Sequence, residues 1–281
     1  MQESSKKDFV EALARGLEVI RSFDRLHMKQ TISQISERTL LARPTVLRLL
    51  LTLEELGYVR SQDNMYSLTP KVVDLGMAYI SALGLYGVAK PHMELLSKQV
   101  DQTVSLAELD GSDIVYTGRV EVPKIVSVGV TVGARLPSAS TALGRVLLAA
   151  IPDSELPDVL STPTMSMYYP RTNFTAEQLR PRLERVRANG WAESDEDLQY
   201  GVHAIAAPIR SEELSVVAAI GIGVHTSEVT KDVIRDKYLP LLLDAAKGIE
   251  HDWRKCAELP NSMAAINLDG LQLLHLRREK A

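Results

Sequence analysis

Cysteine is nearly absent from this chain of 281 residues, which contains a single one, Cys256. One cysteine cannot form an internal disulfide, so the chain is not a disulfide-stabilised secreted domain and fits a reducing cytoplasm. Long apolar runs are also missing: no segment approaches the roughly 20 residues of a membrane-spanning helix, and residues 1–8 are polar rather than signal-like. We therefore expect a cytoplasmic protein with no membrane partner.

Motifs for catalysis, cofactors and metals are equally scarce. The six histidines show no i, i+4 pair and no cysteine partner at metal-ligand spacing. The chain has no G-x-S-x-G nucleophile elbow, no glycine-rich phosphate loop and no local cysteine–histidine pair. We predict no catalytic residue, no cofactor and no metal, although residues far apart in the sequence could still assemble a metal site.

Size and composition predict about two globular domains with ample core, since 45% of the residues are hydrophobic. Charge is distributed unevenly: residues 1–70 contain 10 Lys/Arg and 9 Asp/Glu, whereas the remainder contains 22 and 27. A protein that coats DNA nonspecifically would be far more basic. The distribution fits a site-specific DNA reader attached to an acidic regulatory body.

The segment Thr31–Leu68 contains two short amphipathic helices, a tight turn and a polar hairpin, in that order. The first helix begins after Thr31, a favourable N-cap. The second spans about Pro44–Leu56, with proline in its first turn and Gly57 after its end. A hairpin over residues 58–68 would form a wing. This order predicts a winged helix-turn-helix, although a generic small bundle also has amphipathic helices with outward arginines.

The second helix is expected to present its N-terminal end to DNA. The predicted DNA-binding residues are Thr31, Arg43, Thr45, Arg48 and Thr52. Leu47 and Leu51 are apolar near this face, where thymine methyl groups, the wing or a partner subunit could contact them. Leu40 stands where such turns usually carry glycine, so the turn tolerates a bulky residue or uses another geometry.

The remaining sequence predicts an α+β domain. Helices are expected at about 70–83, 91–100, 142–150, 175–189 and 231–252, with an interruption at 84–87. Strands are expected at 104–109, 114–120, 125–132, 204–209 and 216–224. Hairpin-paired strands followed by strands split by helices indicate an antiparallel sheet with flanking helices. The expected division is a DNA-binding domain 1–70, a linker helix 71–87, an effector domain 88–254 and a C-terminal extension 255–281.

From Phe9 to about Trp253 the chain resembles the IclR family of bacterial transcriptional regulators. The resemblance rests on the winged helix-turn-helix, on GARLPSASTALGRVLLA (Gly133–Ala149) and on GVHAIAAPIR (Gly201–Arg210). The segments ARGLEVIRSFD and LTPKVVDLGMAYISALGL are most similar to the branch containing PcaR, PcaU and PobR, regulators of protocatechuate and related aromatic catabolism. The resemblance implies a GAF-like effector domain joined to the DNA reader by a linker helix.

The resemblance also implies the partners of this chain. They are a palindromic double-stranded DNA operator, a small aromatic or carboxylic acid effector, a second copy in a homodimer or dimer of dimers, and RNA polymerase. Effector binding would shift the relative placement of the reading heads through the linker helix. The branch implies control of protocatechuate or 4-hydroxybenzoate catabolism, and a pathway of another small carboxylic acid is the alternative.

By position in the family, the effector pocket has three walls. Its floor lies at a helix start whose backbone N–H groups suit an anion. The expected effector-binding residues are Ser140, Thr141, Ala142 and Leu143, then Glu196, Asp197, Val202 and Ala204, then Gly221, Gly223 and His225. His225 and Arg135 are candidate partners of a carboxylate or phenol. Ser194 replaces a frequent carboxylate, and the two glycines replace serines, which favours a planar ring unless the glycines serve tight strand packing.

Two other function classes stay open from the sequence. An enzyme domain tethered to a DNA reader would use Glu196, Asp197 and His225 for acid–base chemistry if the three converge. A partner-binding repressor without a small ligand would have a closed and fully packed body domain. We do not expect the enzyme, because the chain carries no activated nucleophile, metal set or cofactor fingerprint.

Overall fold

The computed structural model describes residues 9–24, 26–76, 84–123 and 130–257. The chain divides into two compact units, Met1–Ala82 and Leu83–Ala281. The predicted helix 70–83 begins with a turn at residues 70–71 and is helical over 72–76, and residues 77–83 lie outside the described residues. The same holds for most of the predicted strand 125–132 and for residues 258–281 of the predicted extension.

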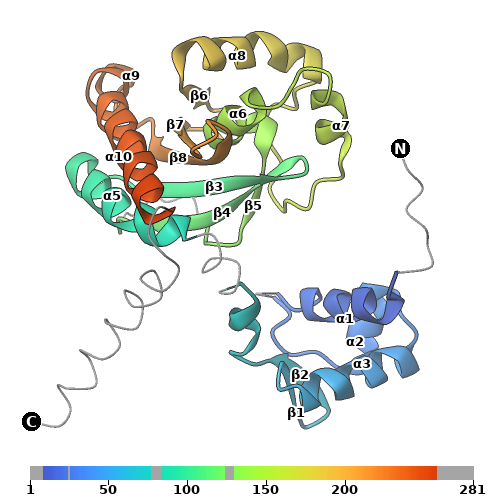
Figure 1. Ribbon diagram of the computed structural model, residues 1–281. Helices are drawn as coiled ribbons and strands as arrows, with labels where there is room; N and C mark the ends of the chain where they lie inside the picture. Colours follow the sequence, from blue (N-terminus) through green and yellow to red (C-terminus); the bar gives the residue numbers. More distant parts are fainter. Residues whose placement is uncertain (1–8, 25, 77–83, 124–129, 258–281) are drawn as a thin grey trace, which may run out of the picture. The chain divides into compact units, whose positions relative to one another are not determined.

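Up to Leu68, the described residues of the first unit form three helices and a hairpin, which confirms the predicted winged helix-turn-helix (Figure 1). Its elements are α1 (Glu11–Arg21), α2 (Ile32–Thr39), α3 (Arg43–Glu55), β1 (Val59–Gln62) and β2 (Met65–Leu68). Thr31 and Gln34 form a reciprocal capping box at the start of α2. The fully buried side chains of Val19, Ile35, Val46 and Leu50 hold the helices together.

Two tight turns of this unit use left-handed backbone. Leu40 has a φ of 57° and is 92% exposed, so its side chain meets no steric hindrance from the rest of the unit, while the left-handed backbone itself remains unfavourable for a residue with a Cβ. Asp63 and Asn64 have φ values of 52° and 60°, which is the pattern of a two-residue type I′ hairpin turn. The turn of the wing therefore consists of two residues, fewer than the polar turn 61–64 that the sequence indicated.

The second unit is built on a six-stranded sheet in the order β5-β4-β3-β8-β7-β6, with every neighbouring pair antiparallel. The strands are β3 (Val104–Asp110), β4 (Asp113–Val120), β5 (Arg135–Pro137), β6 (Ala192–Asp195), β7 (Val202–Arg210) and β8 (Val216–His225). Four of them confirm predicted strands, and β5 and β6 were not predicted. The antiparallel sheet expected for an α+β domain is confirmed.

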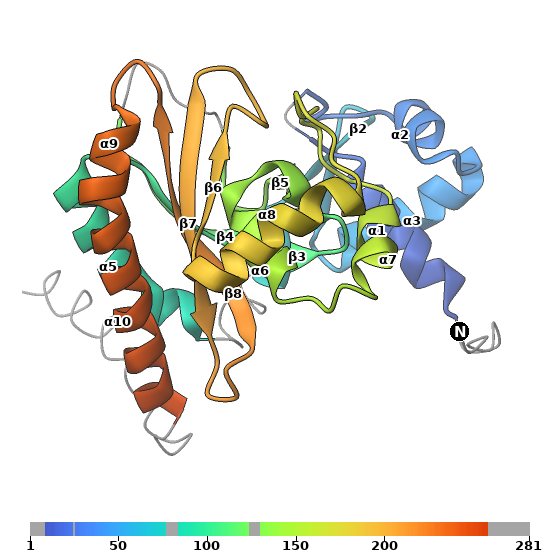
Figure 2. The same cartoon turned by 90° about the horizontal axis from the view of Figure 1, so that it is seen from above.

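Helices cover both faces of this sheet (Figure 2). On one face lie α5 (Leu85–Val100) and α10 (Leu239–Ala257), the latter preceded by α9 (Lys231–Val233) and a π-helical turn at Ile234–Tyr238. On the other lie α6 (Ala142–Ala149), α7 (Leu156–Ser161) and α8 (Ala176–Asn189). The α5 helix begins six residues before the predicted Pro91, because the expected interruption is confined to Gly84, which has a φ of 62°.

Candidate functional site

The α3 helix carries four of the five predicted DNA-reading residues. Arg43 occupies its first position, and Arg43, Arg48 and Thr52 are exposed, while Thr45 is half-buried. The Thr52 hydroxyl donates to the Arg48 carbonyl at 3.0 Å. The fifth residue, Thr31, caps α2 through its side chain. The two arginines thus present positive charge on the surface of the second helix of a helix-turn-helix.

Two leucines flank these polar residues along α3. Leu47 is 38% exposed and Leu51 is 52% exposed. The wing therefore does not cover them. Their apolar character would then be explained by contact with thymine methyl groups or with a partner subunit.

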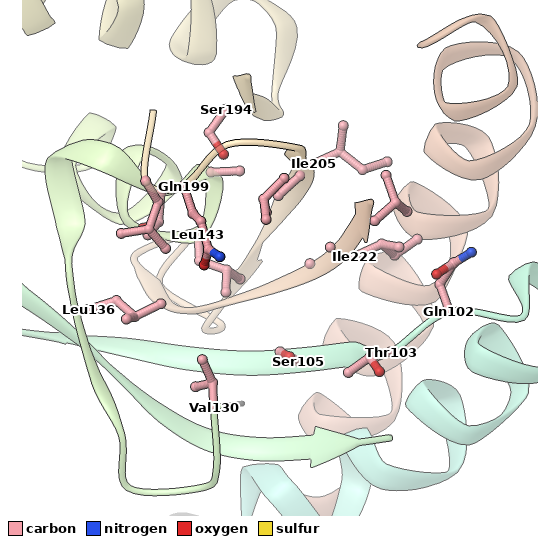
Figure 3. Close-up of a pocket in the computed structure, with 18 of the residues that line it drawn as sticks. Gln102, Thr103, Ser105, Val130, Leu136, Leu143, Ser194, Gln199, Ile205 and Ile222 are labelled. Carbon is pink, nitrogen blue, oxygen red and sulfur yellow. The ribbon is translucent and has the colours of Figure 1, made fainter. Parts of the chain in front are cut away.

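A cavity of about 270 Å³ lies in the second unit, between the sheet and the start of α6. In Figure 3, Ser105 on β3, Leu143 on α6 and Ser194 at the end of β6 approach the same space from different elements. Apolar side chains such as Leu136 and Ile222 alternate with hydroxyl and amide groups along its wall. The closed body domain expected for a repressor without a small ligand does not fit this architecture.

Nine of the eleven predicted effector-binding residues line this cavity. They are Ser140, Thr141, Ala142, Leu143, Val202, Ala204, Gly221, Gly223 and His225. Strand pairing brings the second and third predicted walls together, since Ala204 lies opposite Gly223 and Val202 lies opposite His225. The start of α6 completes the enclosure from above the sheet.

The start of α6 is held tightly in place. The Thr141 hydroxyl accepts a hydrogen bond from the Gly144 N–H at 3.0 Å. A Cβ at Gly144 would lie 2.1 Å from the Ser138 carbonyl oxygen, so only glycine permits this close approach. The backbone N–H groups of Ala142 and Leu143 lie at the positive end of the helix, where a negative or electron-rich ligand group is favoured.

Gly221 and Gly223 differ in their surroundings. A Cβ at Gly221 would lie 2.9 Å from the Ile205 carbonyl oxygen and 3.0 Å from Leu143 Cδ2. A Cβ at Gly223 would meet nothing within 4 Å. Each interpretation made from the sequence therefore applies to one glycine: Gly221 serves tight packing, and Gly223 leaves room beside the cavity.

The structure places Glu196 and Asp197 outside the cavity wall. Asp197 Oδ2 accepts from Arg145 Nη2 at 2.7 Å, and Glu196 Oε2 accepts from Arg171 Nη1 at 3.2 Å. These ion pairs turn both carboxylates toward arginines. The buried Ser194 of β6 lines the cavity instead.

The arginine at the cavity is not the one that the sequence suggested. Arg135 donates to the carboxylates of Asp110 and Asp113 at 2.7 and 3.3 Å and does not line the cavity. Arg119 on β4 does line it, and sequence reasoning missed this residue. A register shift within the β3–β4 pair changes which β4 side chains share a face, so simple alternation cannot assign Arg119.

His225 lies at the cavity with its ring held in one orientation. Its Nδ1 is 2.6 Å from the Ser227 hydroxyl. A Cβ at Gly201 would lie 2.5 Å from His225 Nε2, so the glycine allows the imidazole to pack against the backbone. The predicted candidate partner of a carboxylate or phenol is thus positioned at the cavity wall.

Tyr116 adds a neutral hydroxyl to the cavity wall. Burial raises the pKa of its phenol to about 12, with Arg119 acting in the opposite direction. The phenol therefore stays protonated at physiological pH. Together with hydroxyls such as Thr103 and Ser105, it supplies hydrogen-bonding capacity without negative charge.

The described part of the chain contains neither a metal-binding cluster nor a membrane-spanning helix. There, no group of three or more histidine, cysteine, aspartate or glutamate side chains could hold a metal ion. None of the helices in those ranges is long and apolar enough to cross a membrane.

Comparison with protein families gives matches to both units. Residues 12–63 match the IclR helix-turn-helix domain, and residues 77–251 match the C-terminal domain of the bacterial transcriptional regulator IclR. The two matches together span the helix-turn-helix, the sheet and the cavity-lining elements. The resemblance identified from the sequence is confirmed.

Individual relatives agree with the family matches. The Pca regulon regulatory protein of Pseudomonas putida is 39% identical over 87% of this chain and 84% of that protein. The p-hydroxybenzoate hydroxylase transcriptional activator of Acinetobacter baylyi is 27% identical over 89% of this chain and 94% of that protein. The solved structure of an IclR homolog from Microbacterium hydrocarbonoxydans, complexed with 4-hydroxybenzoate, is 28% identical with a TM-score of 0.74, covering 87% of this chain and 99% of that one.

Proposed function

We propose that this protein, which belongs to the IclR family of bacterial transcriptional regulators, senses a small aromatic carboxylic acid in the cavity beside α6. The observation that carries the proposal is the cavity lined by nine expected residues, with open space at Gly223. Two relatives support the same class of effector, since one is complexed with 4-hydroxybenzoate and another is named a p-hydroxybenzoate hydroxylase transcriptional activator. We propose that the regulated genes belong to aromatic-acid catabolism.

The size and lining of the cavity suit a single aromatic ring. Sites for drug-sized ligands measure roughly 300–1,000 Å³, and the cavity of about 270 Å³ falls just below that range. Leu136, Ile205 and Ile222 offer apolar contact to a ring. The surrounding hydroxyl and N–H groups would bind its polar substituents.

We infer that the second unit senses its ligand and does not convert it. An enzyme would need Glu196, Asp197 and His225 to converge on a substrate. Glu196 and Asp197 are instead ion-paired with Arg171 and Arg145, outside the cavity wall. The relatives described above are regulators.

We further propose that α3 reads a palindromic operator as part of a homodimer or a dimer of dimers, in the cytoplasm, with RNA polymerase as a partner at the promoter. Exposure of Arg43 and Arg48 on α3 supports the DNA-reading role. Effector binding would change the relative placement of two reading heads through the segment 71–87. Because half-site spacing follows the geometry of the dimer, a small reorientation weakens contacts at both half-sites.

Isothermal titration of the full-length protein with 4-hydroxybenzoate tests the proposed effector class. The wild-type protein should bind with one site per chain. Leu143→Trp should weaken binding by more than about tenfold, because the added ring volume fills the cavity and overpacking is unfavourable. Leu95→Trp, at a residue of α5 that is 58% exposed, should bind like the wild type.

The proposed class of ligand and the proposed position of the site are contradicted by different outcomes. Absence of 4-hydroxybenzoate binding by the wild-type protein would contradict the proposed effector class. Wild-type affinity in Leu143→Trp would show that the ligand binds somewhere other than beside α6.

A further inference from the structure

One permanent positive charge lines the effector cavity. Among the lining residues that the structure describes, Arg119 of β4 is the sole arginine or lysine. We propose that Arg119, together with Ser105 of β3, binds the carboxylate of the effector and makes the response specific for an acid. This assignment rests on the proposed function, namely that a small aromatic acid binds in this cavity.

Arg119 and Ser105 form a pair of hydrogen-bond donors on the cavity wall. The two residues lie opposite each other in the β3–β4 register, and Arg119 Nη1 donates to Ser105 Oγ at 3.2 Å. A guanidinium can only donate, so the Ser105 oxygen is the acceptor in this bond and its own proton can point to another acceptor. A carboxylate beside the pair would receive an N–H from Arg119 and an O–H from Ser105.

Arg119 is largely shielded from solvent, in a cavity whose lining also includes the acidic residue Glu228. The Arg119 side chain is 10% exposed, and Ser105 is buried. The Arg119 guanidinium carbon lies 6.0 Å from the centroid of the Tyr116 ring, whose neutral phenol brings no competing charge. Charge interactions in such a partly desolvated site are less weakened than in water. The planar guanidinium also matches the geometry of a carboxylate.

A carboxylate of the chain itself bonds the same arginine. Glu121 Oε1 accepts from Arg119 Nε at 2.8 Å, and the Glu121 side chain is 61% exposed. The effector carboxylate and Glu121 would therefore be two negative groups around one guanidinium. Neutralising Glu121 should strengthen acid binding, whereas neutralising Arg119 should weaken it. A purely structural Arg119–Glu121 pair would not produce effects of opposite sign.

The assignment also sets the direction of the bound ligand. Ser105 is paired with Gly221 in the sheet, and Leu143 at the start of α6 packs against Gly221. With its carboxylate at Arg119 and Ser105, the ligand would direct its opposite substituent toward the N–H groups of α6. The helix start, which the sequence indicated as the anion site, then receives the neutral substituent.

Titration calorimetry with a charged and a neutral ligand of the same shape tests this assignment. We would compare 4-hydroxybenzoate with 4-hydroxybenzamide on the full-length wild-type protein, Arg119→Gln and Glu121→Gln. The wild type should prefer the acid by at least about tenfold, and Arg119→Gln should bind the acid about 10- to 100-fold more weakly, as expected for a lost charge-assisted hydrogen bond. Its affinity for the amide should change far less. Glu121→Gln should bind the acid more tightly.

Two further variants control for structural effects. Arg180→Gln removes an arginine of α8 whose side chain is 50% exposed and which does not line the cavity, so it should bind both ligands like the wild type. Ser105→Ala retains the Arg119–Glu121 pair and should still lose acid affinity by about three- to tenfold. If Arg119→Gln lowers the melting temperature, the acid affinity of Ser105→Ala tests the carboxylate-binding role instead.

Wild-type acid affinity in both Arg119→Gln and Ser105→Ala would overturn the assignment and return the carboxylate to the helix start. Equal weakening of acid and amide in Arg119→Gln would also overturn it, because the loss would then be one of shape. A wild-type protein that binds neither ligand would refute the proposed effector class first, and this assignment with it.

Discussion

The ion pair between Arg145 and Asp197 connects the start of α6 to the loop after β6. Arg145 Nη2 and Asp197 Oδ2 are 2.7 Å apart, and their side chains are 5% and 14% exposed. Arg145 also donates to the carbonyls of Ala139 and Glu193 at 3.1 and 2.7 Å. Burial lowers the pKa of Arg145, and the Asp197 carboxylate counteracts this effect. Asp197 therefore compensates the charge of the buried guanidinium.

We predict that Asp197→Ala lowers the free energy of unfolding of the second unit by about 3–5 kcal/mol, because it leaves a buried charge without its partner. This is a large part of the roughly 5–15 kcal/mol that stabilises a typical domain. Arg145→Met removes the charge together with its demand for a partner. The double variant should thus be less destabilised than the sum of the two single variants.

Urea unfolding followed by tryptophan fluorescence measures this effect. Both tryptophans of the chain, Trp191 and Trp253, belong to the second unit, so the signal reports on that unit. Glu184→Ala, at an exposed carboxylate of α8, should change stability by no more than about 0.5 kcal/mol. If Asp197→Ala unfolds at the wild-type midpoint but loses effector affinity, Asp197 contacts the ligand directly and the reasoning is refuted.

Three further predictions concern the cavity and α3. Gly221→Ser should lower the melting temperature because its Cβ would lie 2.9 Å from the Ile205 carbonyl, whereas Gly223→Ser should melt normally and weaken 4-hydroxybenzoate binding about tenfold in calorimetry. Because burial raises the Tyr116 pKa from 10.0 to about 12, its contribution is complete below pH 10 and is lost as the pH rises toward 12, by up to about 3 kcal/mol. Urea unfolding should therefore show a smaller decline over this window in Tyr116→Phe than in the wild type, and equal declines would contradict the assignment. Arg48→Ala should weaken operator binding by about 1–3 kcal/mol with an unchanged melting temperature, and wild-type affinity would remove Arg48 from the DNA-reading residues.

The helix-turn-helix unit was predictable because its signals act over a few residues. Thr31 and Gln34 are three positions apart, and their side chains satisfy each other's backbone N–H groups. The positive φ of Gly57 after α3 likewise follows from a local requirement of the chain. The wing strands β1 and β2 pair directly with each other across a two-residue turn.

The cavity required information that local patterns do not contain. Family position indicated nine of its lining residues, but the direction of each side chain depends on distant contacts. Asp197 turns away because Arg145, 52 positions earlier, binds it. Arg119 reaches the cavity through a strand pair whose register shifts. The three residues of β5, Arg135–Pro137, are too few to show a period.

The most direct test of the account is the affinity of the full-length protein for DNA immediately upstream of its own gene, with and without 4-hydroxybenzoate. Fluorescence anisotropy at fixed salt should reveal a tight site whose affinity changes when the ligand is added, because effector binding alters the placement of the reading heads. Leu143→Trp should bind the same site without that change. Tight operator binding that is identical with and without saturating ligand would contradict the proposed coupling between the cavity and the DNA-reading unit.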